Sequence, residues 1–243
     1  MQRIRIYIKP ASISDVISIS DKNILNKLRN VLRLRKGHRI NVFDGAGREF
    51  VYEIEELDRK YCSIRQKNIL KKVKPLQKKI TLAFPLVREE KLDFILQKST
   101  ELGVYEFIPF ICERSLNIKC SEAKSERWKK IIREAARQSE RLWLPQLNRI
   151  ISFNDMISSE YDYKIVASAS GDYFGGNFKG NNYSIIIVVG PEGGFSDSEN
   201  QFLKDKHFKF VKLLENILRV ETACIFSVGL VNYFINKESD KAK

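Results

Sequence analysis

Residues 185–196 read IIIVVGPEGGFS, and this stretch decides the fold. The apolar run at its start does not alternate with polar residues, which predicts a strand of a parallel sheet covered on both faces. A glycine-rich turn follows, and Ser196 with Glu199 three residues later predicts the capped start of a helix. Ligands of α/β proteins bind at such turns, where parallel strands end. Taken alone, the turn fits a ligand site and a plain strand–helix connection equally well.

A second turn of this kind lies near the C-terminus, where residues 213–223 read LLENILRVETA. It joins an expected strand at 208–213 to an expected helix at 220–235. Its polar residues Arg219, Glu221 and Thr222 lie at the start of that helix, where anions are favoured. The alternative interpretation is an Arg–Glu pair that only caps the helix.

Between residue 80 and this turn, strands alternate with helices, which is typical of an α/β domain. The further strands that we expect span 80–84, 105–111, 163–167 and 184–189. The further helices that we expect span 89–102, 125–141 and 196–206. The polar residues after Asn236 are expected to form a frayed tail.

The first 70 residues predict a β-rich barrel with one helix. Strands are expected at 3–8, 39–43, 48–54 and 61–65, and residues 44–47, Asp-Gly-Ala-Gly, form a hairpin turn between the second and third. Asp21 is the expected N-cap of a helix that runs to about Arg33. The charged segment 71–75 ends in a proline and predicts a domain boundary, which gives domains of residues 1–72 and 75–243.

The chain of 243 residues has 43 Lys and Arg against 30 Asp and Glu, a net charge of +13. Residues 1–75 hold 18 of these bases and only 8 of the acids, so the first third predicts a polyanionic partner such as RNA. Hydrophobic residues make up 43%, which excludes wholesale disorder. No apolar run approaches the roughly 20 residues of a membrane span, and no secretory signal is evident. We therefore expect a cytoplasmic protein without a membrane partner.

The four cysteines, Cys62, Cys112, Cys120 and Cys224, are scattered along the chain. No two have CxxC spacing, and the two histidines are distant from them in sequence. A zinc or other metal site is therefore not expected, and the cysteines are interpreted as reduced core residues.

Together the segments GPEGGFS and ILRVETA resemble the SPOUT class of RNA methyltransferases. Within that class the chain is similar to the bacterial 16S rRNA uridine-N3 methyltransferase family. Four other stretches carry the same resemblance, which runs nearly end to end: NKLRNVLRL at 26–34, QKSTELGV at 97–104, Pro109 with ERS at 113–115, and EAARQSER at 134–141.

The resemblance implies an N-terminal PUA-like β-barrel that binds RNA and a C-terminal SPOUT α/β domain with a trefoil knot. It implies S-adenosylmethionine as the cofactor. The implied partners are 16S rRNA, in the small ribosomal subunit, and a second copy of the chain, because the family's site lies at the interface of a homodimer.

The resemblance also implies a set of site residues. Arg219 and Glu221 are the expected catalytic residues: Arg219 stabilises the uracil anion, and Glu221 either accepts the N3 proton or, as we prefer, orients Arg219. The residues expected to bind the cofactor are Ser168, Val189, Gly190, Glu192, Gly193, Gly194, Leu213, Leu214, Ile217, Leu218 and Thr222. Those expected to bind RNA are Arg3, Arg5, Arg29, Arg33, Arg35, Arg114 and Arg141, of which Arg114 and Arg141 fit a dimer core equally well.

The sequence departs from the family at two positions of the second turn. The family usually has glycine where Leu214 stands and often arginine where Asn216 stands. This departure is the only support for an alternative, an RNA-binding assembly factor without catalysis. A SPOUT enzyme that methylates ribose 2′-oxygens is the second alternative, and a DNA-binding regulator is disfavoured because no helix-turn-helix pattern is present. The sequence leaves open which nucleotide is modified and whether free RNA or an assembled subunit is the substrate.

Overall fold

The computed structural model describes residues 4–116 and 121–241, and the chain divides into two compact units. The first unit is formed by Met1–Pro75 together with Ala136–Leu144, and the second by Leu76–Ala135 with Pro145–Lys243. The predictions for Arg3 and Cys120 lie outside the described residues. No helix in the described ranges is long and apolar enough to cross a membrane.

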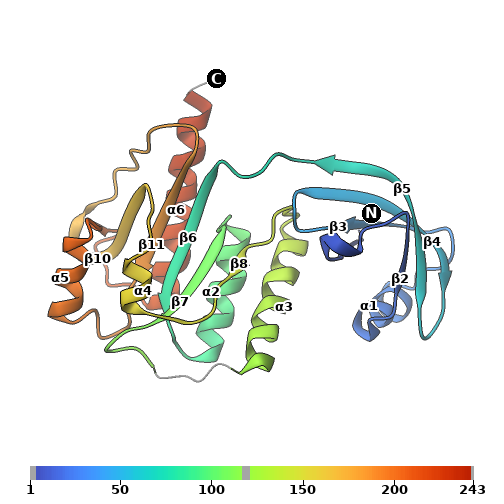
Figure 1. Cartoon of the computed structure of the whole chain (residues 1–243), viewed down its shortest axis with the longest axis horizontal. Coiled ribbons are helices and arrows are strands. Elements are labelled where there is room, and N and C mark those ends of the chain that lie inside the picture. Colours follow the sequence, from blue (N-terminus) through green and yellow to red (C-terminus); the bar gives the residue numbers. More distant parts are fainter. Residues whose placement is uncertain (1–3, 117–120, 242–243) are drawn as a thin grey trace. The chain divides into compact units, whose positions relative to one another are not determined.

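The first unit is built on a five-stranded sheet with the order β1-β3-β4-β5-β2 (Figure 1). β1 (Arg5–Tyr7) pairs parallel with β3 (Arg39–Phe43), and the other neighbours pair antiparallel. These other strands are β4 (Arg48–Leu57), β5 (Cys62–Lys72) and β2 (Val16–Ile19). The sequence did not indicate β2, which is only four residues long and alternates exposed with buried side chains.

The predicted helix of the first unit is present but irregular. Asp21 caps it as expected, because its carboxylate accepts hydrogen bonds from the backbone N–H groups of Asn23 and Ile24. The α-helical part, α1 (Lys22–Asn26), continues into a π-helical turn, η2 (Lys27–Val31), and a separate 3₁₀ turn, η1 (Pro10–Ser12), precedes β2. The helix ends before Gly37 because Arg33 adopts a left-handed conformation with φ of 52°.

The hairpin turn between β3 and β4 is confirmed. The Asp44 carboxylate accepts hydrogen bonds from the backbone N–H groups of Ala46 and Arg48, at 2.8 and 3.0 Å, and its other oxygen pairs with the Arg48 side chain at 2.6 Å. This is the local side-chain contact that makes Asp a common first residue of turns.

Residues 136–144 belong to the first unit, although they are distant from its strands in sequence. Ala136 and Leu142 form a small hydrophobic cluster with Phe43 of β3, and Trp143 bridges to the backbone of Ala46 in the hairpin turn. The expected helix over 125–141 is α3 (Glu122–Gln138), which ends earlier because Glu140 has a positive φ of 56°.

The second unit is built on a seven-stranded sheet in which every pairing is parallel (Figure 1). The main order is β12-β10-β11-β6-β7-β8, and β9 also pairs with β7. The strands are β6 (Lys78–Pro85), β7 (Glu106–Ile111), β8 (Gln146–Leu147), β9 (Ile151–Ser152), β10 (Tyr163–Tyr173), β11 (Tyr183–Val189) and β12 (Lys209–Lys212).

Helices cover both faces of this sheet, as the apolar run at 185–189 predicts. Ile186 and Val188 pack in one cluster with α4 (Phe153–Ile157) and α5 (Asp197–Asp205). Ile185 and Ile187 point to the opposite face and are equally buried, and α6 (Val220–Lys241) contacts β6 and β11 while packing against α2 (Glu89–Glu101). The expected frayed tail after Asn236 is wrong, since α6 continues to Lys241.

Candidate active site

A cavity of ≈ 990 Å³ opens at the carboxyl ends of β10, β11 and β12. Its walls come from residues 166–170 of β10, the glycine loop 189–195 after β11, and the loop 213–219 between β12 and α6, with polar side chains of α5 on one side. The two turns that the sequence singled out therefore lie side by side in one cavity, and β10 supplies a third wall.

The third wall exists because β10 leaves the sheet for four residues. Ala167 and Asp172 both pair with Val211 of β12, so residues 168–171 bulge out of the strand and line the cavity through Ser168 and Ser170. A Cβ atom on Gly171 would lie 2.4 Å from the carbonyl oxygen of Phe210. Only glycine lets the two backbones approach this closely.

The glycine loop is held at its junction with α5 and by a turn of its own. Ser196 and Glu199 form the predicted capping box at the start of α5, and Glu199 uses its other carboxylate oxygen to accept a hydrogen bond of 2.8 Å from the backbone N–H of Glu113. Gly194 has a φ of 70°, a conformation that favours glycine, and its N–H donates to the carbonyl of Pro191. Because Ser196 and Glu199 are buried and hydrogen-bonded, they fix the end of the loop at the start of α5.

The loop after β12 accepts its two unusual residues without strain. Leu214 is not among the described residues with positive φ, so its backbone does not need the freedom of glycine. Leu214 and Asn216 are both exposed and both line the cavity. Ile217 is 90% exposed at the same wall, which is unusual for a large apolar side chain.

Most of the residues predicted to bind the cofactor line this cavity: Ser168, Val189, Gly190, Glu192, Gly194, Leu213, Leu214, Ile217 and Leu218. Gly193 and Thr222 are not among the lining residues. The carbonyl of Gly193 instead accepts a hydrogen bond of 2.8 Å from the guanidinium of Arg114, and Thr222 is exposed in the first turn of α6.

The structure separates the two predicted catalytic residues. Arg219 lines the cavity, is exposed, and pairs with no carboxylate in the described part of the chain. Glu221 points elsewhere: its Oε2 lies 3.5 Å from the Nζ of Lys91 in α2. The expected Arg219–Glu221 pair is therefore not formed, and the preferred role of Glu221 in orienting Arg219 by direct contact is not supported by the geometry.

Sequence reasoning missed Lys91, which also forms an ion pair of 2.7 Å with Glu192 of the glycine loop. The hydrogen bond from Lys91 lowers the pKa of the Glu192 carboxyl, and the same contact raises the pKa of Lys91. No local signal marks this residue, because a lysine on the first turns of a charged helix is ordinarily solvated.

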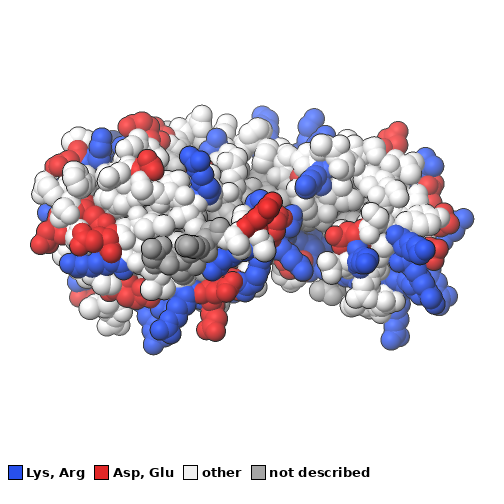
Figure 2. Space-filling view, turned by 60° about the horizontal axis from the view of Figure 1, so that its bottom comes forward, with Lys and Arg blue, Asp and Glu red and all other residues white. Residues whose placement is uncertain are grey.

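In the first unit, three of the arginines predicted to bind RNA lie together. Arg29, Arg33 and Arg35 line a cavity of ≈ 670 Å³ with Lys36, and Glu55, Glu56 and Leu57 form its other side. Arg33 and Arg35 are exposed and Arg29 is half-buried. Figure 2 shows Lys and Arg side chains grouped over the first unit, at the right of the view.

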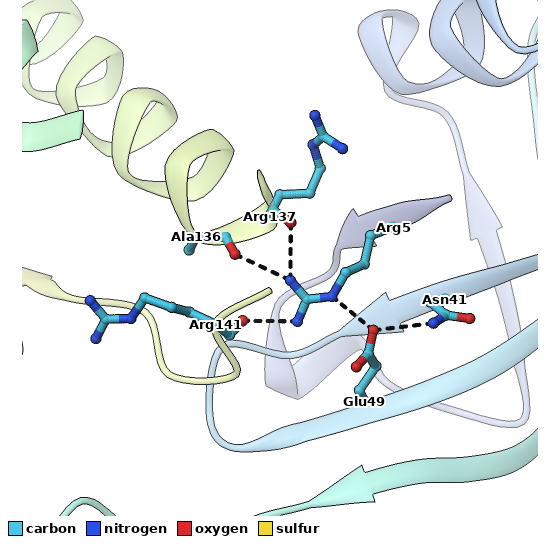
Figure 3. Close-up of polar contacts among 6 residues, drawn as sticks. All are labelled: Arg5, Asn41, Glu49, Ala136, Arg137 and Arg141. Atoms are coloured by element: carbon cyan, nitrogen blue, oxygen red, sulfur yellow. Dashed lines mark hydrogen bonds and ion pairs between the residues drawn. The ribbon is translucent and has the colours of Figure 1, made fainter. Parts of the chain in front are cut away.

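The prediction that Arg5 binds RNA is wrong, because its side chain is buried inside the first unit (Figure 3). Its side chain is 2% exposed and pairs with Glu49, also 2% exposed, at 2.7 Å. Its remaining N–H groups donate to the carbonyls of Ala136, Arg137 and Arg141 at 3.2, 3.2 and 2.8 Å. The guanidinium is thus fully engaged inside the unit, where it ties β1 to residues 136–141.

The last two predicted RNA-binding residues lie in different settings. Arg114 is exposed beside the glycine loop, through its hydrogen bond to Gly193. Arg141 is half-buried, and burial lowers the pKa of its guanidinium to about 10, so the group remains charged at neutral pH. Among the described residues, no group of His, Cys, Asp and Glu is arranged to hold a metal ion.

The chain is similar to known RNA methyltransferases over most of its length. A family model for the RNA methyltransferase domain matches residues 74–232, and one for the RNA methyltransferase PUA domain matches residues 28–67. A ribosomal RNA small subunit methyltransferase E from Rickettsia conorii is 33% identical, over 93% of this chain and 94% of the relative. The protein of that name from Bacillus subtilis is 31% identical, over 96% of each chain.

Solved structures agree with these relatives. The ribosomal RNA small subunit methyltransferase E of Neisseria gonorrhoeae, bound to S-adenosyl methionine, matches with a TM-score of 0.84 and 28% identity over 96% of this chain and 98% of that one. A putative methyltransferase from Legionella pneumophila with the same bound cofactor matches with a TM-score of 0.85 and 26% identity, over 96% of this chain and 98% of that one. The predicted α/β fold with an N-terminal PUA-like domain is confirmed.

Proposed function

Because the chain belongs to the RNA methyltransferase family, as its motifs predict, we propose that it methylates ribosomal RNA with S-adenosylmethionine. The acceptor that we propose is N3 of a uridine in the 16S rRNA of the small ribosomal subunit. The names of the curated relatives support the RNA, the cofactor in the related structures supports the methyl donor, and the paired C-terminal motifs support the choice of atom.

The observation that carries this proposal is the cavity at the ends of β10, β11 and β12. Its volume of ≈ 990 Å³ lies at the upper end of the range of about 300–1,000 Å³ that is common for ligand sites. The glycine loop offers backbone N–H and C=O groups to a nucleoside, and Val189, Leu213 and Leu218 offer apolar walls for a base. The residues present therefore fit S-adenosylmethionine, which would be held mainly by backbone groups and apolar contact.

Uracil N3 carries a proton near neutral pH and is a poor nucleophile until that proton leaves. When bound, S-adenosylmethionine supplies an electrophilic methyl group on a positively charged sulfur. Arg219 and Lys204 both line the cavity as exposed cations, and neither forms an ion pair with a described residue. In this proposal Arg219, in the loop before α6, stabilises negative charge on the uracil oxygens. The walls of the cavity must also hold N3 in line with the methyl group, which requires the base to be splayed out of its RNA stack.

The N-terminal domain, residues 1–72, binds the RNA in this proposal, and residues 75–243 carry out the transfer. The basic cavity around Arg29, Arg33 and Arg35 supports this division, because its guanidinium groups suit phosphates. We also propose that Arg114, which donates a hydrogen bond to the Gly193 carbonyl of the glycine loop, contacts RNA near the reacting base.

The proposal extends to a homodimer with a trefoil knot in the second domain, acting in the cytoplasm. The resemblance supports the dimer and the knot. Ile217, 90% exposed at the cavity wall, is an apolar side chain that a second copy would cover. Sedimentation of the purified protein should then give twice the chain mass of 28.3 kDa.

The test is methyl transfer from labelled S-adenosylmethionine to small ribosomal subunits that lack the modification, followed by mass spectrometry of the nucleosides. We expect 3-methyluridine. A methyl group on a ribose oxygen would replace the proposed activity by that of a 2′-O-methyltransferase. Binding of the subunit without transfer of label would make the protein a non-catalytic RNA-binding factor.

A further inference from the structure

Lys91 joins three segments that are distant in sequence. It lies in the first turns of α2, and its Nζ contacts Glu192 in the glycine loop at 2.7 Å and Glu221 in the first turn of α6 at 3.5 Å. From this geometry we infer that Lys91 is a positioning residue, which sets the glycine loop and the start of α6 relative to each other. Because the glycine loop is a wall of the proposed cofactor cavity, the inference rests on the proposed function.

The two contacts of Lys91 differ in strength. The Glu192 side chain is 55% exposed, so water screens this pair and it contributes little by itself. The Glu221 side chain is 15% exposed, and its Oε2 is shielded from solvent and accepts no hydrogen bond from any described residue. Lys91 is therefore the charge that compensates a largely buried carboxylate, and its loss would leave that carboxylate unpaired.

If Glu221 moved, the backbone at the start of α6 would move with it and would change the shape of the cavity. Glu221 is two residues from Arg219 and follows Val220, the first residue of α6. Arg219 and Val220 line the cavity, as does Glu192 on the other side of Lys91. One ammonium group thus fixes the separation of two cavity walls, and Arg219 depends on it for its position.

This geometry also gives Glu221 a role different from proton acceptance. Its buried oxygen faces Lys91 of the scaffold, whereas Arg219 lies at the cavity. Glu221 is the anchor on α6 that Lys91 holds, and a neutral amide there would weaken the anchor without removing an ionisation from the reaction.

The first experiment compares Lys91→Met, Lys91→Arg and the control Lys98→Met. Methionine keeps the length of the stem without the charge. Lys98 lies on the same helix, and among the described residues its one ion pair is with Glu101 in the next turn. By calorimetry, Lys91→Met should raise the Kd for S-adenosylmethionine about tenfold, which corresponds to about 1.4 kcal/mol. Lys91→Arg should restore most of this affinity, and Lys98→Met should bind as the wild type does.

The second experiment needs no cofactor. Amide hydrogen exchange of the ligand-free protein should be faster at residues 192–194 and 221–224 in Lys91→Met than in the wild type, and unchanged in Lys98→Met. If the wild type binds no S-adenosylmethionine but Lys91→Met loosens both segments, the positioning role stands and the cofactor assignment fails. Unchanged exchange in both segments would overturn the positioning role.

The third experiment tests the part of Glu221. Glu221→Gln should raise the same Kd. The double variant with Lys91→Met should be no worse than Lys91→Met alone, because the contact that Glu221→Gln breaks is already lost in Lys91→Met. The pH dependence of kcat should keep its shape in Glu221→Gln. Additive effects, or loss of an ionisation from the kcat profile, would instead make Glu221 a proton acceptor that acts without Lys91.

Discussion

Arg219 is the residue on which the proposed chemistry depends most directly. Replacement by alanine should leave the Kd for S-adenosylmethionine within a few-fold, because the cofactor is held mainly by backbone and apolar walls. The methyl-transfer rate should fall about 10²–10³-fold, as when one charge-stabilising donor is removed. Calorimetry and single-turnover methylation separate the two effects. An equal loss of cofactor affinity and of rate would show that Arg219 holds the cofactor and not the substrate.

Arg5 has a structural role and no catalytic one, so the prediction for Arg5 concerns the stability of the first unit. Arg5→Met breaks a pair in which both side chains are 2% exposed and leaves the charge of Glu49 buried. Breaking such a pair destabilises a protein by about 3–5 kcal/mol, which urea unfolding of the first unit should reveal.

The matched control for Arg5 is Arg39→Met in β3. The Arg39 side chain is 71% exposed and lies 3.9 Å from Glu53. Its loss should change the free energy of unfolding by at most about 1 kcal/mol, as is usual for surface pairs. Similar losses in the two variants would contradict a structural role specific to Arg5.

At the level of elements, the bulge in β10 links strand packing to the cavity. Gly171→Ala would place a methyl group 2.4 Å from the carbonyl oxygen of Phe210, so β10 and β12 must separate or the bulge must move. We expect a loss of about 1–3 kcal/mol in the free energy of unfolding, together with weaker binding of S-adenosylmethionine.

Gly175→Ala is the control for this prediction, because a Cβ atom there meets nothing within 4 Å and its φ is not positive. It should be nearly neutral in thermal unfolding and in cofactor binding. If Gly171→Ala behaves in the same way, the close approach of the two backbones does not shape the cavity.

The elements also show how far the sequence could predict the structure. The strand, the glycine turn and the Ser196–Glu199 capping box were predicted because each depends on residues within a few positions of one another. The bulge at 168–171 depends on β12, some forty residues later, and the contact of Lys91 with Glu221 joins α2 to α6. No local pattern records such pairings.

Arg5 illustrates the same limit. The alternation of Arg3, Ile4, Arg5 and Ile6 predicts a strand with its arginines towards solvent. The strand is present, but the face that carries Arg5 is covered by residues 136–141. The residues around β1 do not indicate that this distant segment packs on the strand, so the sequence predicted Arg5 to lie at the surface.

For the whole molecule, the uneven charge predicts how RNA binding depends on salt. Each phosphate contact releases a counterion, so the slope of log K against log salt counts the contacts. Removing Arg29 and Arg33 together should weaken binding and reduce the slope by about 0.7–0.9 for each lost phosphate contact. Arg5 is buried, so the slope should instead be retained by any Arg5 variant that remains folded.

Filter binding of a 16S rRNA fragment between low and moderate salt measures these slopes. Lys124→Ala with Lys130→Ala is a matched control that removes the same charge from α3 of the other unit. If the control lowers the slope as much as the loss of Arg29 and Arg33, the RNA responds to net charge alone. If only the arginine variant lowers the slope, the basic cavity of the first unit binds phosphates. The excess of positive charge in residues 1–75 then marks an RNA-binding site.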